Sequence, residues 1–310
     1  MRILLEEIIV MKRVTVLLTM LISTVSLVGC SVKSGYEATP VPAQKQTIDY
    51  KTVNGKTLEL DLYLPSQQQV VPLLVWVHGG AWMRGSKDEF LTKNGRLANT
   101  LLNHGYAVAV INYRLSSEAT FPAPVADIND AINYLIDRHQ EYSLKNDSVV
   151  MMGRSAGAHL AMLAATSNTY DNGFYLAGNE PRYKVSAVVD FFGPSDLVEL
   201  KGNSGAIDHD APDSSQAKML GKSPREDAEL AKWASPTTYI NNTTPPFIIF
   251  HGLNDTTVPY SQSEHLKSVL DGYGVENHLY LVDGAHHGDP IFDTQPYVTK
   301  VLDFIQAKVE

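Results

Sequence analysis

Short, continuous runs of apolar residues recur along the chain and are separated by longer segments of mixed polarity. Such runs are typical of parallel strands buried on both faces. The runs predicted to be strands are residues 73–77, 107–111, 149–152, 185–192, 247–250 and 278–282. Between them, helical patterns cover residues 88–103, 127–139, 158–165, 261–270 and 298–307. Strands alternating with helices predict an α/β fold with a mostly parallel central sheet flanked by helices.

A different pattern precedes these runs. Residues 47–64 alternate between apolar and polar positions around Asn54 and Gly55. Asn-Gly between two alternating segments is a strong hairpin signal. We therefore predict two antiparallel strands at one edge of the sheet.

The N-terminal segment predicts export. Residues 14–29 are apolar and follow Lys12 and Arg13, as in a secretory signal, and are too few for a comfortable transmembrane helix. The stretch ends in Leu-Val-Gly-Cys, which resembles the bacterial lipobox and implies lipidation of Cys30. An ordinary signal peptide or an uncleaved anchor is the alternative. The preferred interpretation is a bacterial lipoprotein, exported and anchored to a membrane through its N-terminal lipid.

This interpretation divides the chain. Residues 1–30 form the signal with its lipobox, the Ser-, Pro- and Gln-containing residues 31–46 a flexible tether, and residues 47–310 one catalytic domain. The acidic pair at positions 6 and 7 is unusual before an export signal, so Met11 is the preferred start of translation over Met1.

The net charge and the cysteine content of the chain argue against some classes of partner and cross-link. The net charge of −9 argues against nucleic acid or an anionic membrane surface as the main partner. The chain has one cysteine, Cys30, so no disulfide is expected in the mature domain.

The most informative stretch follows the run at 149–152. Gly153, Ser155 and Gly157 form Gly-x-Ser-x-Gly between a predicted strand and a predicted helix. This is the pattern of a nucleophile elbow, in which a sharp turn exposes the serine hydroxyl. A serine that only caps a helix is the alternative, and the residues that follow in the chain decide against it.

A second loop offers hydrogen-bond donors. The predicted strand at 73–77 ends in His-Gly-Gly-Ala-Trp, residues 78–82. Adjacent glycines let a backbone approach a ligand closely. We expect the N–H groups of Gly80, Ala81 and Ala156 to face a developing oxyanion. His78 is interpreted as a structural residue that orients the loop, and Trp82 as part of the pocket wall or of the layer beneath it.

An acid and a base follow in order. Asp255 comes after the predicted strand at 247–250, and two histidines, His286 and His287, come after the strand at 278–282. A serine nucleophile needs a base, and the base needs a carboxylate. The order Ser, Asp, His is the one that α/β-hydrolases use.

Other polar clusters are given structural interpretations. Asp127 and Asp130 are read as salt-bridged residues of a helix rather than as a catalytic pair. Residues 208–210, Asp-His-Asp, are read as a solvated loop rather than a metal site. Residues 197–232, rich in Gly, Ser, Asp and Pro, are predicted to form a small lid. No metal or cofactor is expected.

Together these motifs resemble the α/β-hydrolases of the bacterial carboxylesterase kind. The chain is similar to hormone-sensitive-lipase-like enzymes and to the feruloyl and acetyl esterases. The matches run from about Leu73 to the C-terminus, and the matching segments begin at residues 78, 112, 153, 193, 234, 251 and 258. Relatives usually end in Gly-Ala-Gly-His-Gly, which implies that His287 is the base and that His286 replaces a glycine. Ala81 stands where the family often has a third glycine.

The resemblance implies hydrolysis of short-acyl or sugar-linked esters through an acyl-enzyme, without a cofactor. Its substrates would be small esters or acylated carbohydrates. Three alternatives stay open: an arylformamidase, a peptidase of the same fold, and a non-catalytic surface-binding lipoprotein. The last is disfavoured because all three candidate catalytic residues are present.

Overall fold

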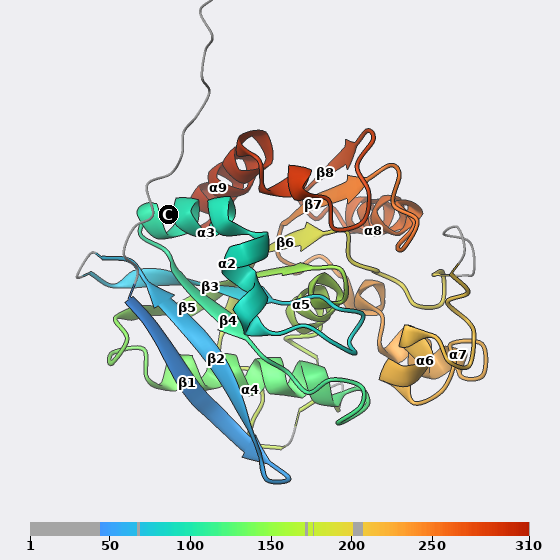
Figure 1. Cartoon of the computed structure of the whole chain (residues 1–310), viewed down its shortest axis with the longest axis horizontal. Helices are drawn as coiled ribbons and strands as arrows, with labels where there is room; N and C mark the ends of the chain where they lie inside the picture. Colours follow the sequence, from blue (N-terminus) through green and yellow to red (C-terminus); the bar gives the residue numbers. More distant parts are fainter. Residues whose placement is uncertain (1–43, 67–68, 171–172, 176, 201–206, 310) are drawn as a thin grey trace, which may run out of the picture. The chain divides into compact units, whose positions relative to one another are not determined.

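An eight-stranded sheet forms the centre of the described chain (Figure 1). The structure is a computed structural model and describes residues 44–309 except 67–68, 171–172, 176 and 201–206. The strands are β1 (Gln44–Val53), β2 (Lys56–Leu64), β3 (Val71–Val77), β4 (Ala107–Ile111), β5 (Leu144–Arg154), β6 (Lys184–Phe191), β7 (Phe247–Gly252) and β8 (Asn277–Val282). The predicted signal and Cys30 lie outside the described residues.

The strand order β1-β2-β4-β3-β5-β6-β7-β8 gives a mostly parallel sheet. β1 pairs with β2, and β2 with β4, antiparallel, whereas every pairing from β4 to β8 is parallel. Parallel strands end at the same edge, so Val77, Gly153 and Asp190 stand in register on β3, β5 and β6. The predicted fold class is thereby confirmed.

The N-terminal hairpin lies at one edge of this sheet, as predicted. Asn54 and Gly55 have φ of 50° and 78°, the pair of left-handed residues that a type I′ turn requires. β1 begins at Gln44, so residues 44–46, assigned to the tether from the sequence, are strand. Residues 31–43 of the predicted tether lie outside the described residues.

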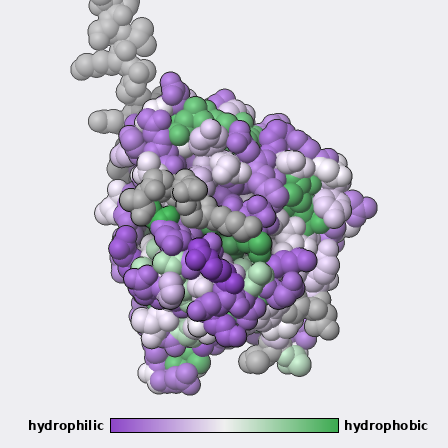
Figure 2. Space-filling view, turned by 90° about the vertical axis from the view of Figure 1, so that its right-hand side faces the viewer, coloured by the Kyte–Doolittle hydropathy of each residue, from purple (hydrophilic) through white to green (hydrophobic). Residues whose placement is uncertain are grey.

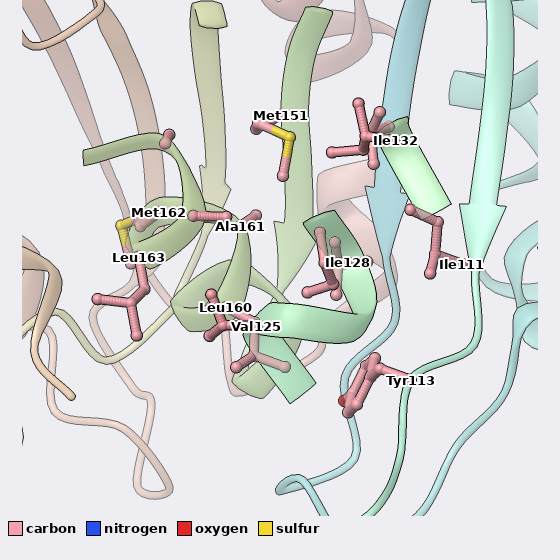
Figure 3. Packing of buried hydrophobic residues seen from close by; sticks show 14 of the residues in the cluster. Ile111, Tyr113, Val125, Ile128, Ile132, Met151, Leu160, Ala161, Met162 and Leu163 are labelled. Carbon is pink, nitrogen blue, oxygen red and sulfur yellow. The ribbon is translucent and has the colours of Figure 1, made fainter. Parts of the chain in front are cut away.

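Helices cover both faces of the sheet. On one face lie α4 (Ala123–Asp137), α5 (Ala156–Thr166) and α8 (Ser261–Gly272), and on the other lie α3 (Gly95–Asn103) and α9 (Gln295–Val309). Figure 3 shows the first layer, where Ile128 and Ile132 of α4 and Leu160 of α5 pack toward Met151 of β5. These side chains are fully buried. Burial of this apolar surface holds α5, and with it the turn before α5, against the sheet.

The predicted helix at 88–103 is divided in the structure. It consists of η1 (Lys87–Glu89), α2 (Phe90–Lys93) and α3, with a break at Asn94, where φ is −140° and ψ is 39°. Both the backbone N–H and the side-chain amide of Asn94 donate to the carbonyl of Phe90. An asparagine that bonds its local backbone competes with helix continuation, which accounts for the break.

α4 starts at Ala123, earlier than the predicted Asp127. The Phe-Pro-Ala-Pro run at 121–124 indicates a turn and the entry to a helix, and α4 begins within this run because proline is tolerated in the first turn of a helix. The other predicted helices and strands occur with bounds that differ by a few residues.

The predicted lid region contains α6 (Ser215–Leu220) and α7 (Ala228–Trp233), followed by η2 (Pro236–Tyr239). Met219, Leu220 and Ala231 are buried in the core cluster that also includes α4 and α5. The described part of residues 197–232 therefore packs on the body of the domain through apolar side chains.

The surface of the domain is mainly polar. Figure 2 shows a face on which hydrophilic residues prevail and apolar residues form small separate groups. None of the helices that the structure describes has the length and apolarity needed to cross a bilayer. η3 (Pro290–Asp293), a short 3₁₀ helix, completes the elements.

Candidate active site

Ser155 is the single residue that connects the end of β5 to the start of α5. Its φ is 53° and its ψ is −126°, a backbone conformation that a non-glycine residue rarely adopts. The turn has no room for a side chain on its inner side. A Cβ on Gly157 would lie 2.2 Å from the carbonyl oxygen of Val77, and one on Gly153 would lie 2.5 Å from that of Gly157. The two glycines thus allow α5 to approach β3, and the serine side chain is left at the apex.

The three predicted residues meet at the carboxyl edge of the sheet. The Oγ of Ser155 lies 2.8 Å from Nε2 of His287, and Nδ1 of His287 lies 2.7 Å from Oδ2 of Asp255. Because Asp255 accepts the proton on Nδ1, Nε2 is free to accept the hydroxyl proton. Ser155, Asp255 and His287 therefore form one continuous hydrogen-bonded chain, although they follow three different strands.

Asp255 is buried and held by several donors. Its Oδ1 accepts the N–H groups of Thr257 and Val258 at 2.8 and 2.9 Å, and Nε2 of His251 lies 3.3 Å from its Oδ2. Burial alone would raise its pKa, but the hydrogen bonds from His251 and His287 outweigh it and hold the pKa well below the usual value. The carboxyl group is therefore an anion at neutral pH.

The neighbouring histidine points elsewhere. Nδ1 of His286 lies 3.1 Å from the carbonyl oxygen of Asn254, and the residue is exposed. By residue type alone both histidines are candidate bases, and the family resemblance implies His287. The contacts place His287, and not His286, beside Ser155.

The loop after β3 faces Ser155. A Cβ on Gly79 would lie 3.5 Å from Cβ of Ser155. Gly80 and Ala81 have φ of 115° and 55°, so the chain is turned there into the left-handed region. Their N–H groups have no acceptor within the described residues, and Ala156 is the first residue of α5, where an N–H has no intrahelical partner. All three residues predicted for the oxyanion hole thus have N–H groups free of intrahelical or loop acceptors.

His78 and Trp82 fix this loop from behind. Nδ1 of His78 donates to the carbonyl of Gly79 at 2.8 Å, and the His78 ring stacks on Tyr113 at 4.4 Å. The Trp82 indole is only 2% exposed and donates to Nδ1 of His159 at 3.2 Å. Trp82 is not among the residues that line the cavity at Ser155, so it belongs to the packing around the loop, where its indole N–H is satisfied.

His159 joins three segments. Its Nδ1 accepts from Trp82, so its proton lies on Nε2, which donates to the carbonyl of Ala234 at 2.8 Å. Burial lowers the pKa of His159 to about 4, so the ring stays neutral at neutral pH. The loop at 78–82, α5 and the segment after α7 are tied together through this one side chain.

A cavity of about 340 Å³ opens at Ser155 and His287. The sequence reasoning missed most of its wall. The additional lining residues are Trp76, Arg84, Glu89, Phe90, Lys93, Asn94, Arg154, Phe192, Thr257 and Gly288. No lining residue comes from the described part of 197–232. The interpretation of that region as a lid stays a prediction.

Two of these wall residues adjoin Ser155 and His287. Phe192, which has φ of 48°, presents its ring to His287 at a centroid distance of 4.9 Å. The guanidinium of Arg154 lies over the same ring at 5.1 Å. Arg154 fills a variable position of Gly-x-Ser-x-Gly, so its role in the wall had no motif to indicate it.

A buried carboxyl group lies next to this site. Asp190 is fully buried near the end of β6, and its Oδ1 accepts the N–H of Gly193 at 2.8 Å. Its Oδ2 has no partner within the described residues. Burial raises the pKa of Asp190 to about 7, against the smaller effect of the bond from Gly193.

The remaining polar clusters form ion pairs. Asp127 accepts Nε of Arg114 at 2.7 Å and Nζ of Lys51 at 2.8 Å, and Lys51 also contacts Asp130. This is the salt-bridged arrangement expected for the two aspartates. In the described part of the chain, no group of three or more His, Cys, Asp or Glu side chains is arranged to hold a metal.

The sheet order, the elbow and the hydrogen-bonded Ser, His and Asp define the chain as an α/β-hydrolase. Residues 60–270 match the BD-FAE family, and the chain belongs to this family. The sequence resemblance to esterases is thereby confirmed at the level of the family.

Relatives and a solved structure support the same placement. The probable carboxylic ester hydrolase LipM of Mycobacterium tuberculosis is 33% identical over 62% of this chain and 43% of its own. Esterase LipQ of the same organism is 30% identical over 70% of this chain and 50% of its own. The chain thus spans half or less of the length of these two curated relatives. A truncated carbohydrate esterase from gut microbiota has a TM-score of 0.75 and 27% identity, covering 88% of this chain and 98% of that one.

Proposed function

We propose that the chain is a serine carboxylesterase that acts through an acyl-enzyme. The observation that carries this proposal is the hydrogen-bonded chain from Ser155 through His287 to Asp255, at 2.8 and 2.7 Å. The relatives named carboxylic ester hydrolase and esterase support the reaction class.

The geometry assigns each step to an atom. Nε2 of His287 takes the proton of Ser155 as Oγ attacks the ester carbonyl carbon. The resulting imidazolium, stabilised by ionised Asp255, then returns the proton to the departing alcohol, leaving an acyl group on Ser155. Water activated by His287 attacks the acyl carbonyl in turn, and the acid and the free serine are released.

The oxyanion of each tetrahedral intermediate would be bound by backbone donors. The N–H groups of Gly80, Ala81 and Ala156 are the candidates. Loss of a single donor of this kind typically costs about 3 kcal/mol of transition-state stabilisation. Because these donors are backbone groups, alanine at position 81 can serve as well as glycine.

For the substrate we propose a short-acyl or sugar-linked ester, of the acetyl or feruloyl type. The likeness to a carbohydrate esterase over 98% of that chain supports the sugar-linked class. A cavity of about 340 Å³ lies at the lower end of the range for small-molecule sites, which favours a small group beside Ser155.

We also propose that the mature protein is an exported lipoprotein. The lipobox-like end of the apolar stretch at 14–29 and the single cysteine at position 30 support this. In this proposal residues 31–43 connect the lipid to β1, and the region 197–232 acts as a lid.

The decisive assay compares wild type and Ser155→Ala on 4-nitrophenyl acetate, butyrate and octanoate, acetylated xylan and methyl ferulate. Wild type should hydrolyse at least one ester, and Ser155→Ala none, with an unchanged circular dichroism spectrum. Ser261→Ala, at an exposed serine of α8, is the matched control and should keep wild-type turnover.

A fluorophosphonate label separates the alternatives. It should modify wild type at Ser155 and leave Ser155→Ala unmodified. Failure to label would favour the non-catalytic lipoprotein. Labelling together with faster cleavage of N-formylkynurenine or a peptide amide than of any ester would favour the arylformamidase or the peptidase.

A further inference from the structure

The wall of the cavity beside Ser155 carries an excess of positive charge. Arg84, Lys93 and Arg154 line it, against the single carboxylate of Glu89. The chain as a whole carries a net charge of −9, so this local excess does not follow from its composition. A concentration of one charge in a concave site attracts ligands of the opposite charge.

Of these three cations, only Lys93 has a carboxylate as an ion-pair partner within the described residues. Its Nζ lies 2.6 Å from Oε2 of Glu89, and both side chains are at least 40% exposed. This pair is neutral as a unit, so the uncompensated charge of the wall is on the two arginines.

Arg154 is held by neutral groups. Its Nη1 donates to Oδ1 of Asn94 at 3.0 Å and to the carbonyl of Lys93 at 3.3 Å, and Nη2 to the carbonyl of Asp289 at 3.5 Å. Burial lowers its pKa to about 10, partly offset by Asp289 and Asp293, so the group is still charged at neutral pH. Those two carboxylates instead accept backbone N–H groups of η3 and α3. Since a guanidinium has five N–H donors, at least two of Arg154 remain for a ligand.

Arg84 is fixed near the oxyanion loop. Its Cγ lies 3.2 Å from the position that a Cβ on Gly80 would take, so its stem packs beside Gly80. Among the described residues its guanidinium has no hydrogen-bond or ion-pair partner, and the residue is exposed. The Arg84 guanidinium therefore lines the cavity that contains Ser155 with N–H donors that are available to a ligand.

We propose that this cavity selects esters that carry a carboxylate group, which Arg84 and Arg154 bind beside the scissile bond. Guanidinium groups match the geometry of a carboxylate and bind it through paired, charge-assisted hydrogen bonds. An acylated uronic acid or the monoester of a dicarboxylic acid has this chemistry. The inference rests on the proposed ester hydrolysis at Ser155.

Two pairs of probes distinguish the two sides of the ester. In the first pair, monomethyl succinate carries a carboxylate on the acyl side, and methyl 4-oxopentanoate is its neutral counterpart. In the second pair, 4-acetoxybenzoate carries the carboxylate on the alcohol side, and its methyl ester is the neutral counterpart. Hydrolysis of the acetyl group is measured by the release of the phenol. In at least one pair, wild type should prefer the anionic ester, and added salt should reduce that preference because salt screens exposed charges.

The variant Arg84→Gln removes the charge and keeps a polar side chain. The ratio of kcat/KM for the anionic over the neutral ester should fall by about tenfold or more, mainly through KM. Lys184→Gln removes an exposed charge at the amino end of β6, away from the cavity, and should leave the ratio within about twofold of wild type. An unchanged ratio in Arg84→Gln for both pairs would overturn the inference.

Binding separates this inference from the proposed function. By calorimetry, Ser155→Ala should bind the anionic member of at least one of the two pairs about tenfold more tightly than the neutral member, and Ser155→Ala/Arg84→Gln should not. Equal affinities in Ser155→Ala would refute the anion site even if esters are hydrolysed. If wild type hydrolyses no ester but Ser155→Ala shows this difference, the proposed function fails and the anion site stands.

Discussion

His286 and His287 are adjacent on one loop, but only His287 reaches both Ser155 and Asp255. His286 instead contacts the carbonyl of Asn254. A difference of one position along the chain therefore separates a ring that can exchange a proton with the nucleophile from one that can only support the loop.

This arrangement predicts opposite effects for two matched substitutions. His287→Gln should lower kcat for ester hydrolysis by at least about 10³-fold, since removal of one triad member removes the general base. His286→Gln should change kcat less than about fivefold, because its contact is with the backbone outside the hydrogen-bonded chain. Steady-state kinetics on 4-nitrophenyl acetate measures both, and a larger loss in His286→Gln would reverse the assignment.

Asp190 predicts a pH dependence of stability. Its folded pKa of about 7 lies above the usual value of 3.8, so the folded state binds more protons than the unfolded state between these values. The free energy of unfolding should therefore fall as the pH rises from about 4 to 7 and level off above. Asp190→Asn keeps the acceptor for Gly193 and lacks this titration.

Urea unfolding at pH 5 and pH 8 tests this. The free energy of unfolding of Asp190→Asn minus that of wild type should increase by about 2–4 kcal/mol from pH 5 to pH 8. Taking the difference between variants cancels the titration of other groups. The same pH dependence in both proteins would show that Asp190 does not titrate in this range.

At the scale of single residues, the sequence was most informative where a motif required a residue type. Ser155, Asp255 and the histidine pair follow predicted strands, and the structure brings them together as that order suggests. Their catalytic roles stay predictions. No position of a motif fixes Arg154, Phe192 or Arg84, and their place in the cavity depends on tertiary packing that no local pattern encodes.

Between elements, the close approach of α5 to β3 positions Ser155. Gly157 is the contact point, because any side chain there would meet the carbonyl oxygens of Val77 and His78 at 2.2 and 2.4 Å. Those atoms belong to the backbone of a central strand and its end, so they cannot move without disturbing the sheet or the oxyanion loop.

Gly157→Ala should therefore destabilise the fold by about 2 kcal/mol or more and lower esterase activity, as overpacking of a core does. Gly272→Ala, at the last residue of α8 and with open space around its Cβ position, is the matched control and should be neutral or slightly stabilising. Thermal unfolding of both variants gives the comparison. Equal melting temperatures would show that α5 can shift away from β3 at little cost.

Helices and strands could be predicted where the hydrophobic pattern extends over many residues. The predicted bounds were wrong where a side-chain hydrogen bond or a proline determines the end of a helix. The core strands and the hairpin at Asn54 and Gly55 agree with their patterns. The break at Asn94 and the early start of α4 depend on a side-chain hydrogen bond and on prolines compatible with a first turn. Short helices such as α6 and α7 carry too few residues for a period to be recognised.

For the whole molecule, the parallel sheet gathers residues that are far apart in sequence. The strand order places the ends of β5, β7 and β8 along one edge. The fold class followed from the alternation of strands and helices, whereas the division into signal, tether and domain is a proposal.

The lipoprotein proposal makes a whole-chain prediction. When the full chain is expressed in a bacterium, wild type should fractionate with the membranes and be released by detergent. Cys30→Ala should differ in mass from wild type. It should be found either in the soluble fraction or as an unprocessed chain that its signal segment still anchors. Ser31→Ala is the matched control at the next position. Metabolic labelling with an alkyne fatty acid gives the direct readout, and an unlabelled wild-type chain would contradict lipidation.

The order in which the site residues occur along the chain has a consequence for biosynthesis. A growing chain presents the oxyanion loop at 78–82 first and Ser155 next, but the proposed base at 287 is made only shortly before α9. β8 must pair with β7 before His287 can reach Ser155. Until β8 has been made and has joined the sheet, the nascent polypeptide would thus carry a serine without a base, and it would gain reactivity only after that pairing.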